Sequence, residues 1–334
     1  MAKIAILGSG GWGTALAVML SKNGHAVALW SLFPEEIETL RKDHENKKLL
    51  PGVLIPEDIE LTNDCKCVTD KDLVIFAVPS FAIRGTAKLF SGYLSSDSLV
   101  ANVSKGFEKE TLKFLTQVLQ EELPTQKIVA LSGPSHAEEV GRGLPTTIVS
   151  ASQDLVAAEA VQDIVMNDTL RIYTNQDLIG VELAAALKNV IALCTGICDG
   201  MGYGDNTRAA LITRGLHELS CLGVAMGAQQ ATFAGLAGVG DLIVTCTSMH
   251  SRNHRFGILI GEGVSTQEAL EKIGMTVEGY HAAKAAQALS EKYHVSMPII
   301  EMCCRVLYEG MSPELAVNHL MARPKCSETE DFAQ

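Results

Sequence analysis

The first half of the chain alternates short apolar runs with amphipathic segments. Many of the short apolar runs carry β-branched residues, and several are followed by Gly, Pro or Ser turn signals. Seven are predicted to be strands: Ile4–Leu7, Ala26–Trp30, Leu73–Val78, Leu99–Val103, Ile128–Leu131, Thr146–Val149 and Leu170–Tyr173. The segments between them that have helical spacing are Pro34–Asn46, Ala82–Phe90, Thr111–Glu122 and Asp154–Met166. Several strands are apolar on both faces, as expected when helices cover both sides of a parallel sheet. The pattern predicts a doubly wound α/β domain.

From about Asp177 the pattern is helical only. The predicted helices are Leu178–Cys198, Thr207–Met226, Thr266–Ile273, His281–Lys292 and Pro298–Tyr308, and we find no convincing strand there. We therefore predict two domains, an α/β domain over residues 1–176 and an all-helical domain over residues 177–334. Ser327–Gln334 is expected to be a frayed acidic tail.

Composition narrows the class of protein. In 334 residues, 47% are hydrophobic and 20% charged, which excludes a disordered chain. The net charge of −12 disfavours nucleic acid and anionic membranes as partners. No stretch approaches the roughly 18 uninterrupted apolar residues of a membrane span, and glycines interrupt the apolar N-terminus where a signal peptide would need continuity. Nine cysteines without framework spacing predict reduced thiols, so we expect a soluble, cytoplasmic protein.

The first motif with chemical meaning is Gly8-Ser9-Gly10-Gly11-Trp12-Gly13, between the first strand and a helix. In this context G-x-G-x-x-G predicts a Rossmann-type dinucleotide site. Gly8 permits the tight turn, Gly10 lets the backbone approach a pyrophosphate, and Gly13 allows close packing of helix and strand. The free amides at the helix start meet the phosphate charge.

Cofactor preference stays open. NAD-selective sites usually carry Asp or Glu at the end of the second strand, where it bonds the ribose 2′-hydroxyl. Here that strand ends Leu29-Trp30-Ser31-Leu32, with neither a carboxylate nor an arginine, and Arg41 and Lys42 lie further along.

The second feature is Lys188, in the apolar helical segment Val181–Leu193. Its neighbours at helical spacing are small or apolar, so we expect it to be buried. Burial of an unpaired ammonium costs several kcal/mol, and desolvation lowers a lysine's pKa. Such a lysine is suited to polarise or protonate a carbonyl oxygen. The alternative is a lysine that extends to solvent from a less buried face.

A third cluster begins with the glycine-rich segment Gly235–Gly240, which delivers Asp241 close to a ligand, and Thr245 follows. Ser251 is a plausible N-cap, and Arg252 and Asn253 then lie at a helix start suited to phosphate. His250 and His254 have i, i+4 spacing, but the glutamate of H-E-x-x-H is missing, so no metal site is expected. Lys105 and Gly133–His136 follow predicted strands, at the sheet edge where ligands bind.

These segments together resemble the bacterial NAD(P)-dependent glycerol-3-phosphate dehydrogenase family. The likeness covers nearly the whole chain, and its most specific motifs are Glu-Leu-x-x-x-x-Lys-Asn, ending at Asn189, and Ser251-Arg252-Asn253. The resemblance implies reduction of dihydroxyacetone phosphate to sn-glycerol 3-phosphate by NADPH or NADH, at the entry to glycerophospholipid synthesis. Relatives often carry Arg or His where this chain has Ser31-Leu32, so their usual preference for NADPH is in doubt here.

The resemblance also implies site roles. Lys188 is the expected catalytic lysine, and Lys105 is expected to touch both substrate and nicotinamide. The other expected substrate residues are Gly133, Ser135, Asn189, Asp241, Thr245, Ser251, Arg252 and Asn253. The expected cofactor residues are Gly8, Gly10, Gly11, Trp12, Gly13, Lys105, Ala137, Arg252, Val277 and Glu278. The partner is the small-molecule substrate, and a homodimer is expected because apolar helical domains often dimerise.

Two alternatives remain at this point. A β-hydroxyacid dehydrogenase or ketopantoate reductase also joins a Rossmann-type half to helices with a central lysine, but its substrates carry carboxylates. A catalytically silent dinucleotide sensor would bind cofactor without turnover and would have no reason to keep a lysine inside an apolar helix.

Overall fold

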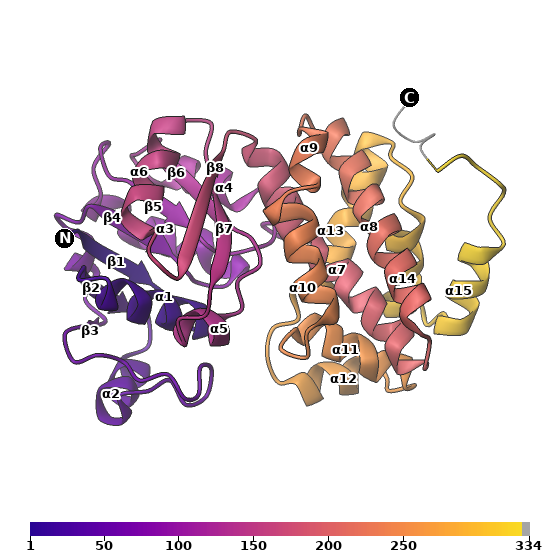
Figure 1. Cartoon of the computed structure of the whole chain (residues 1–334), viewed down its shortest axis with the longest axis horizontal. Coiled ribbons are helices and arrows are strands. Elements are labelled where there is room, and N and C mark those ends of the chain that lie inside the picture. Colours follow the sequence, from indigo (N-terminus) through magenta and orange to yellow (C-terminus); the bar gives the residue numbers. More distant parts are fainter. Residues whose placement is uncertain (329–334) are drawn as a thin grey trace. The chain divides into compact units, whose positions relative to one another are not determined.

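The computed structural model describes residues 1–328. The chain divides into two compact units, Met1–Leu178 and Ile179–Gln334, whereas the sequence pattern placed this boundary after residue 176. Over the part of the chain that is described, every strand belongs to the first unit, and the second is built from helices (Figure 1).

An eight-stranded sheet forms the centre of the first unit, in the order β3-β2-β1-β4-β5-β6-β7-β8. The strands are β1 (Lys3–Leu7), β2 (Ala26–Trp30), β3 (Glu60–Thr62), β4 (Leu73–Phe76), β5 (Val100–Asn102), β6 (Ile128–Ser132), β7 (Thr146–Ala151) and β8 (Leu170–Asn175). All neighbours run parallel except β6 and β7. The chain order reverses between β1 and β4, and ligands of such sheets bind beyond the carboxyl ends of the strands at that point.

Both faces of this sheet are covered, as the alternating side chains of β1 illustrate. Ile4 and Ile6 belong to an apolar cluster with residues of α1, α2 and α6, and Ala5 and Leu7 to another with residues of α3 and α4. This explains why the strands are apolar throughout. The helices are α1 (Gly11–Lys22), α2 (Pro34–Asp43), α3 (Ile83–Phe90), α4 (Leu115–Glu122), α5 (Ala137–Gly141) and α6 (Leu155–Val165), with short 3₁₀ turns at Cys65–Val68, Ser80–Ala82 and Ser91–Tyr93.

The structure corrects the predicted sheet in two places. β3 has three residues, too few to give a periodic pattern, and was missed. β7 runs antiparallel to β6, against the expected parallel sheet. The connecting helix α5 has only five residues. A helix of that length rises about 7 Å, against about 17 Å for a strand of five residues. It therefore does not carry the chain back along the strand for a parallel return.

Two predicted helices are shorter than expected, because one residue within each predicted range has left-handed backbone. α2 ends at Asp43, since His44 has a φ of 50°. α4 begins at Leu115 instead of Thr111, since Leu112 has a φ of 57°.

The second unit is helical, as predicted. Its helices are α7 (Leu178–Gly200), α8 (Asp205–Ala225), α9 (Gln230–Phe233), α10 (Asp241–Thr247), α11 (Arg252–Gly261), α12 (Thr266–Ile273), α13 (Glu278–Tyr293), α14 (Pro298–Glu309) and α15 (Pro313–Met321), with a π-helical turn, η4, at Leu236–Gly240. Of the predicted tail, Ser327 and Glu328 are described, and the remainder lies outside the described residues.

α7 is the core helix of this unit. It is long and apolar enough to span a membrane, but 94% of its most apolar window is buried inside the protein. A bent pair, Gln230–Thr247 with Arg252–Gly261, passes the same length and composition test only when taken as one span. The burial of α7 is that of a helix at the centre of a bundle.

α7 and α11 approach each other closely through glycines. Gly196 and Gly200 on α7 face Gly257 and Gly261 on α11. A Cβ at any of the four would lie 2.1 to 2.2 Å from a carbonyl oxygen of the other helix. The glycines therefore set the spacing between the helix that carries Lys188 and the helix that begins at Arg252.

Candidate active site

The loop after β1 has the geometry of a dinucleotide-binding turn. Gly8 has a φ of +122°, and a Cβ there would lie 2.6 Å from the carbonyl oxygen of Ala77. A Cβ on Gly13 would lie 2.0 Å from the carbonyl oxygen of Gly8, and one on Gly11 would lie 2.6 Å from that of Leu49. Around Gly10, in contrast, a Cβ would meet nothing within 4 Å. This side of the loop is open, as the approach of a diphosphate requires.

The start of α1 supplies hydrogen-bond donors at the same loop. The first bond within the helix runs from the amide of Thr14 to the carbonyl of Gly10, at 2.9 Å. The amides of Gly11, Trp12 and Gly13 precede it and have no acceptor within the helix. No acidic side chain lies in the first turn of α1 to compete for them. The loop and helix start therefore fit the diphosphate of NAD or NADP.

Other predicted residues gather at the same carboxyl edge of the sheet. Lys105 follows β5 and donates from Nζ to the carbonyl oxygen of Gly133, which follows β6, at 3.1 Å. Ser135 donates to the same oxygen at 2.9 Å. Ala137, at the start of α5, and Trp12, on α1, pack partly buried against one core cluster. The first unit thus brings its predicted residues to one edge of the sheet.

A carboxylate at the end of β2 was missed by the sequence analysis. Glu36 lies in the first turn of α2, and its Oε2 accepts hydrogen bonds from Ser31 at 2.6 Å and from Ser9 at 2.8 Å. The strand end itself offers only Ser31 and Leu32. The available signal was the proline at position 34, which starts a helix and returns its first turn toward the strand.

Lys188 is buried, as predicted, with 6% of its surface exposed. Its ammonium is paired, because Nζ donates to the Asp241 carboxylate and to Thr245 Oγ1, the latter at 2.7 Å. Asp241 is only 1% exposed, so the pair is shielded from water. Thr245 donates its own hydroxyl proton to the carbonyl oxygen of Asp241, which turns an oxygen lone pair toward Lys188. The two partners hold Lys188 Nζ at a defined position.

The glycine-rich segment before α10 places Asp241 beside Lys188. Leu236–Gly240 forms a π-helical turn that leads directly into α10, and Asp241 is the first residue of α10. A Cβ on Gly238 would lie 2.1 Å from the carbonyl oxygen of Phe233, so the turn requires glycine there. Single π turns occur frequently at functional sites.

The start of α11 lies beside Lys188. Ser251 caps the helix as predicted, accepting from the amide of His254 at 3.2 Å. Asn253 donates to the side-chain oxygen of Asn189 at 2.9 Å and accepts from the amide of Gly279 at 2.8 Å. Arg252 is the first residue of α11. Buried Val277 and the adjacent Glu278 precede Gly279 in the chain, so every predicted residue of the second unit belongs to one neighbourhood.

His254 ties α11 to α7 and α8. It is buried, with Nε2 3.2 Å from Asp199 and Nδ1 3.5 Å from the hydroxyl of Thr195. Asp199 also accepts from Arg208 at 2.8 Å. Burial lowers the pKa of His254, and the Asp199 charge opposes this only in part. His254 therefore holds α11 against α7. Within residues 1–328, no group of three or more His, Cys, Asp or Glu side chains is suited to a metal ion.

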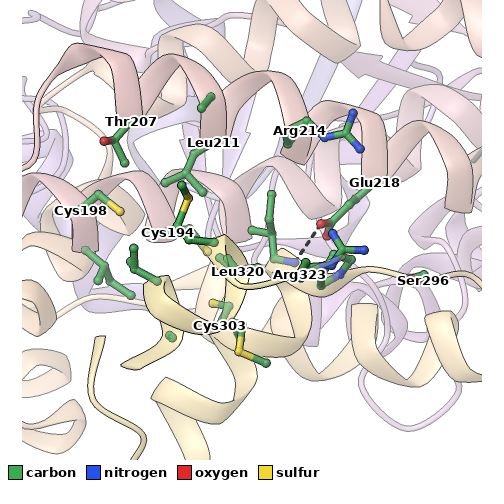
Figure 2. Close-up of a pocket in the computed structure, with 18 of the residues that line it drawn as sticks. Cys194, Cys198, Thr207, Leu211, Arg214, Glu218, Ser296, Cys303, Leu320 and Arg323 are labelled. Carbon is green, nitrogen blue, oxygen red and sulfur yellow. Dashed lines mark hydrogen bonds between the residues drawn. The ribbon is translucent and has the colours of Figure 1, made fainter. Parts of the chain in front are cut away.

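A separate cavity of about 510 Å³ lies in the second unit. None of the predicted site residues lines it. Figure 2 shows Glu218, Arg214 and Arg323 near one another on its wall, with Cys194 and Cys303 elsewhere along it. Glu218 accepts from the first amides of α14, Ile299 at 2.8 Å and Ile300 at 3.3 Å. Burial nevertheless raises its pKa to about 8.

The doubly wound sheet, its open glycine loop and a helical unit with a buried lysine–aspartate pair define the class: a nicotinamide-dependent oxidoreductase. Residues 3–158 match the family model described as NAD-dependent glycerol-3-phosphate dehydrogenase N-terminus, and residues 177–318 match its C-terminus. The chain is 52% identical over 333 residues to the NAD(P)+ glycerol-3-phosphate dehydrogenase of Desulfitobacterium hafniense (strain Y51), which covers 100% of this chain and 95% of the relative. The chain therefore belongs to the NAD-dependent glycerol-3-phosphate dehydrogenase family.

Solved structures agree with this assignment. The crystal structure of glycerol-3-phosphate dehydrogenase from Coxiella burnetii has a TM-score of 0.91 and 38% identity, covering 96% of this chain and 99% of that chain. A ketopantoate reductase from Ralstonia eutropha, a protein of the alternative class, has a TM-score of 0.57 and 16% identity, covering 94% of this chain and 99% of that chain. It shares the fold alone. The protein is thus a dehydrogenase that uses NADH or NADPH.

Proposed function

We propose that this enzyme reduces dihydroxyacetone phosphate to sn-glycerol 3-phosphate and that Lys188 is its proton donor. The observation that carries the proposal is the buried Lys188–Asp241–Thr245 arrangement beside the start of α11. A catalytically silent dinucleotide sensor has no use for a charge pair inside an apolar helix bundle, where desolvation is costly.

The Lys188 ammonium can assist reduction of the substrate carbonyl. When bound, the dihydronicotinamide supplies a hydride to the carbonyl carbon, and negative charge develops on the carbonyl oxygen. Lys188 stabilises that charge and transfers a proton from Nζ to the oxygen, which completes the alcohol. Asp241 and Thr245 keep Nζ in place while the charge develops, so little reorganisation is needed during the step. In the reverse direction Lys188 accepts the hydroxyl proton.

The phosphate is assigned to the start of α11. Arg252 supplies a planar donor fork at the first helical position, and no acidic residue lies in the first turn. Backbone amides at a helix start favour an anion. Asn253 and Asn189 bond to each other at 2.9 Å, which joins this helix start to the residue next to Lys188. We assign Ser251 to the cap that shapes this helix start.

The first unit is assigned to the cofactor. The loop Gly8–Gly13 and the start of α1 bind the diphosphate, with Trp12 and Ala137 at its border. Lys105, Gly133 and Ser135 are assigned to the substrate, with Lys105 also touching the nicotinamide. Arg252, Val277 and Glu278 are assigned to the cofactor from the second unit.

The test follows NADPH and, separately, NADH oxidation by the purified protein with dihydroxyacetone phosphate. Unphosphorylated dihydroxyacetone and a 2-keto acid serve as control substrates. We expect turnover only with the phosphorylated substrate, and Lys188→Met should abolish turnover while cofactor binding, measured by titration calorimetry, stays within about twofold. Turnover of the keto acid, or undiminished turnover by Lys188→Met, would refute the assignment.

We further propose that the product supplies glycerophospholipid synthesis and that the enzyme acts in the cytoplasm as a homodimer. The family relationship and the apolar composition of the helical unit support this. Light scattering coupled to size exclusion tests the dimer, and a mass of one chain at micromolar concentration contradicts it.

A further inference from the structure

The end of β2 carries a carboxylate held in a fixed position. Ser31, directly after β2, and Ser9, inside the glycine loop, both donate to Oε2 of Glu36. Both serines are buried, with 3% and 7% of their surface exposed. A buried hydroxyl has few alternative acceptors, so these two bonds fix the carboxylate against the loop.

This position is the place where a Rossmann-type domain meets the adenosine ribose. The loop and the strand end are joined directly, since the amide of Gly8 donates to the carbonyl oxygen of Trp30 at 2.9 Å. In such domains the diphosphate lies on the loop, and an acidic side chain near the end of the second strand accepts from the ribose 2′-hydroxyl. Glu36 reaches this place from the first turn of α2, five residues after Ser31.

The segment that follows β2 carries no cation for a 2′-phosphate, and the next basic residues along the chain, Arg41 and Lys42, lie in the last turn of α2. Residues 31–36 read Ser-Leu-Phe-Pro-Glu-Glu, without lysine or arginine. Leu32, 60% exposed, occupies the position beside Ser31. Arg41, near the other end of α2, donates to the carbonyl oxygen of Leu61.

We infer that Glu36 makes the enzyme selective for NADH over NADPH. The carboxylate accepts a hydrogen bond from the ribose 2′-hydroxyl of NADH, using Oε1, because the bonds from Ser9 and Ser31 both go to Oε2. Toward NADPH the same carboxylate repels the 2′-phosphate. Two unit charges about 4 Å apart in water change a dissociation constant by about fivefold, and a doubly charged phosphate changes it more. The inference goes beyond the proposed function and does not depend on the role of Lys188.

The test measures dissociation constants of NADH and NADPH by isothermal titration calorimetry on the full-length protein, without substrate. We expect the wild type to bind NADH at least about fivefold more tightly. Glu36→Gln should tighten NADPH binding at least about fivefold and weaken NADH binding only slightly, because an amide still pairs with a hydroxyl. Leu32→Arg combined with Glu36→Gln should reverse the preference.

Glu35→Gln is the matched control, since it makes the same charge change one residue earlier on the same exposed helix turn. We expect it to leave the ratio of the two constants within about twofold. The buried anchors of α2 are Ile37 and Leu40, so neither substitution removes a core contact, and circular dichroism checks folding. A wild-type preference for NADPH, an unchanged ratio in Glu36→Gln, or an equal change in Glu35→Gln would each overturn the inference. Because these are binding constants, loss of the proposed catalytic function leaves the test intact.

Discussion

The charge pair between Lys188 and Asp241 provides the sharpest test of the second unit. Asp241→Leu removes the carboxylate and leaves the lysine, 6% exposed, inside the helix bundle. Thr245 still accepts from Nζ at 2.7 Å, but it brings no compensating charge. Removal of one partner from a buried pair costs about 3–5 kcal/mol, whereas replacement of both by apolar side chains of similar volume is close to neutral. We therefore expect Asp241→Leu to lose about 3–5 kcal/mol and Lys188→Met/Asp241→Leu to recover most of that loss.

The unfolding assay must report on the second unit, which contains Lys188 and Asp241. Both tryptophans of the chain, Trp12 and Trp30, lie in the first unit, so tryptophan fluorescence follows that unit alone. Urea unfolding monitored by far-ultraviolet circular dichroism, together with fluorescence, separates the helical unit from it. Asp241→Asn is the control that keeps an acceptor oxygen and removes only the charge. Wild-type stability in Asp241→Leu, or a double variant that loses the sum of the single losses, would show that the two residues are not coupled.

Three further predictions concern other parts of the chain. The folded pKa of Glu218, about 8, lies above its ordinary value of 4.5, with Arg214 and Arg323 as the facing cations. The wild type should therefore lose up to about 5 kcal/mol of stability as pH rises from about 4.5 to about 8, and Glu218→Gln should lose none of this. Urea unfolding at about pH 6 and about pH 9 should reveal about 3 kcal/mol of that loss in the wild type alone. Arg252→Ala should raise the KM for the phosphorylated substrate at least about tenfold in steady-state kinetics, and an unchanged KM would remove the phosphate assignment. Gly10→Ala should weaken cofactor binding, measured by calorimetry, without a loss of stability, because a Cβ there meets no protein atom within 4 Å. Gly13→Ala should reduce both cofactor affinity and stability, because its Cβ would lie 2.0 Å from the carbonyl oxygen of Gly8. Equal losses of affinity and of stability in the two variants would contradict this loop geometry.

The sequence alone predicted the parts of this protein that depend on neighbours along the chain. The strand–glycine–helix order at Gly8–Gly13 requires left-handed backbone and close packing within a few residues. The cap at Ser251 is also a contact between residues three apart. The burial of Lys188 was predictable because the residues around it in its own helix are apolar.

The partners of these groups depend on tertiary structure. A buried ammonium requires a counter-charge, but the chain has 39 acidic residues, and the one that serves lies 53 positions away on α10. Glu36 is likewise tied to Ser9, 27 positions earlier, through the packing of α2 beside the end of β2. The direction of β7 depended on the short helix before it. Hydrophobic periodicity indicates which face of a segment is buried. It does not indicate what that face packs against, and that packing decides the ion pairs, the strand direction and the contact between Glu36 and Ser9.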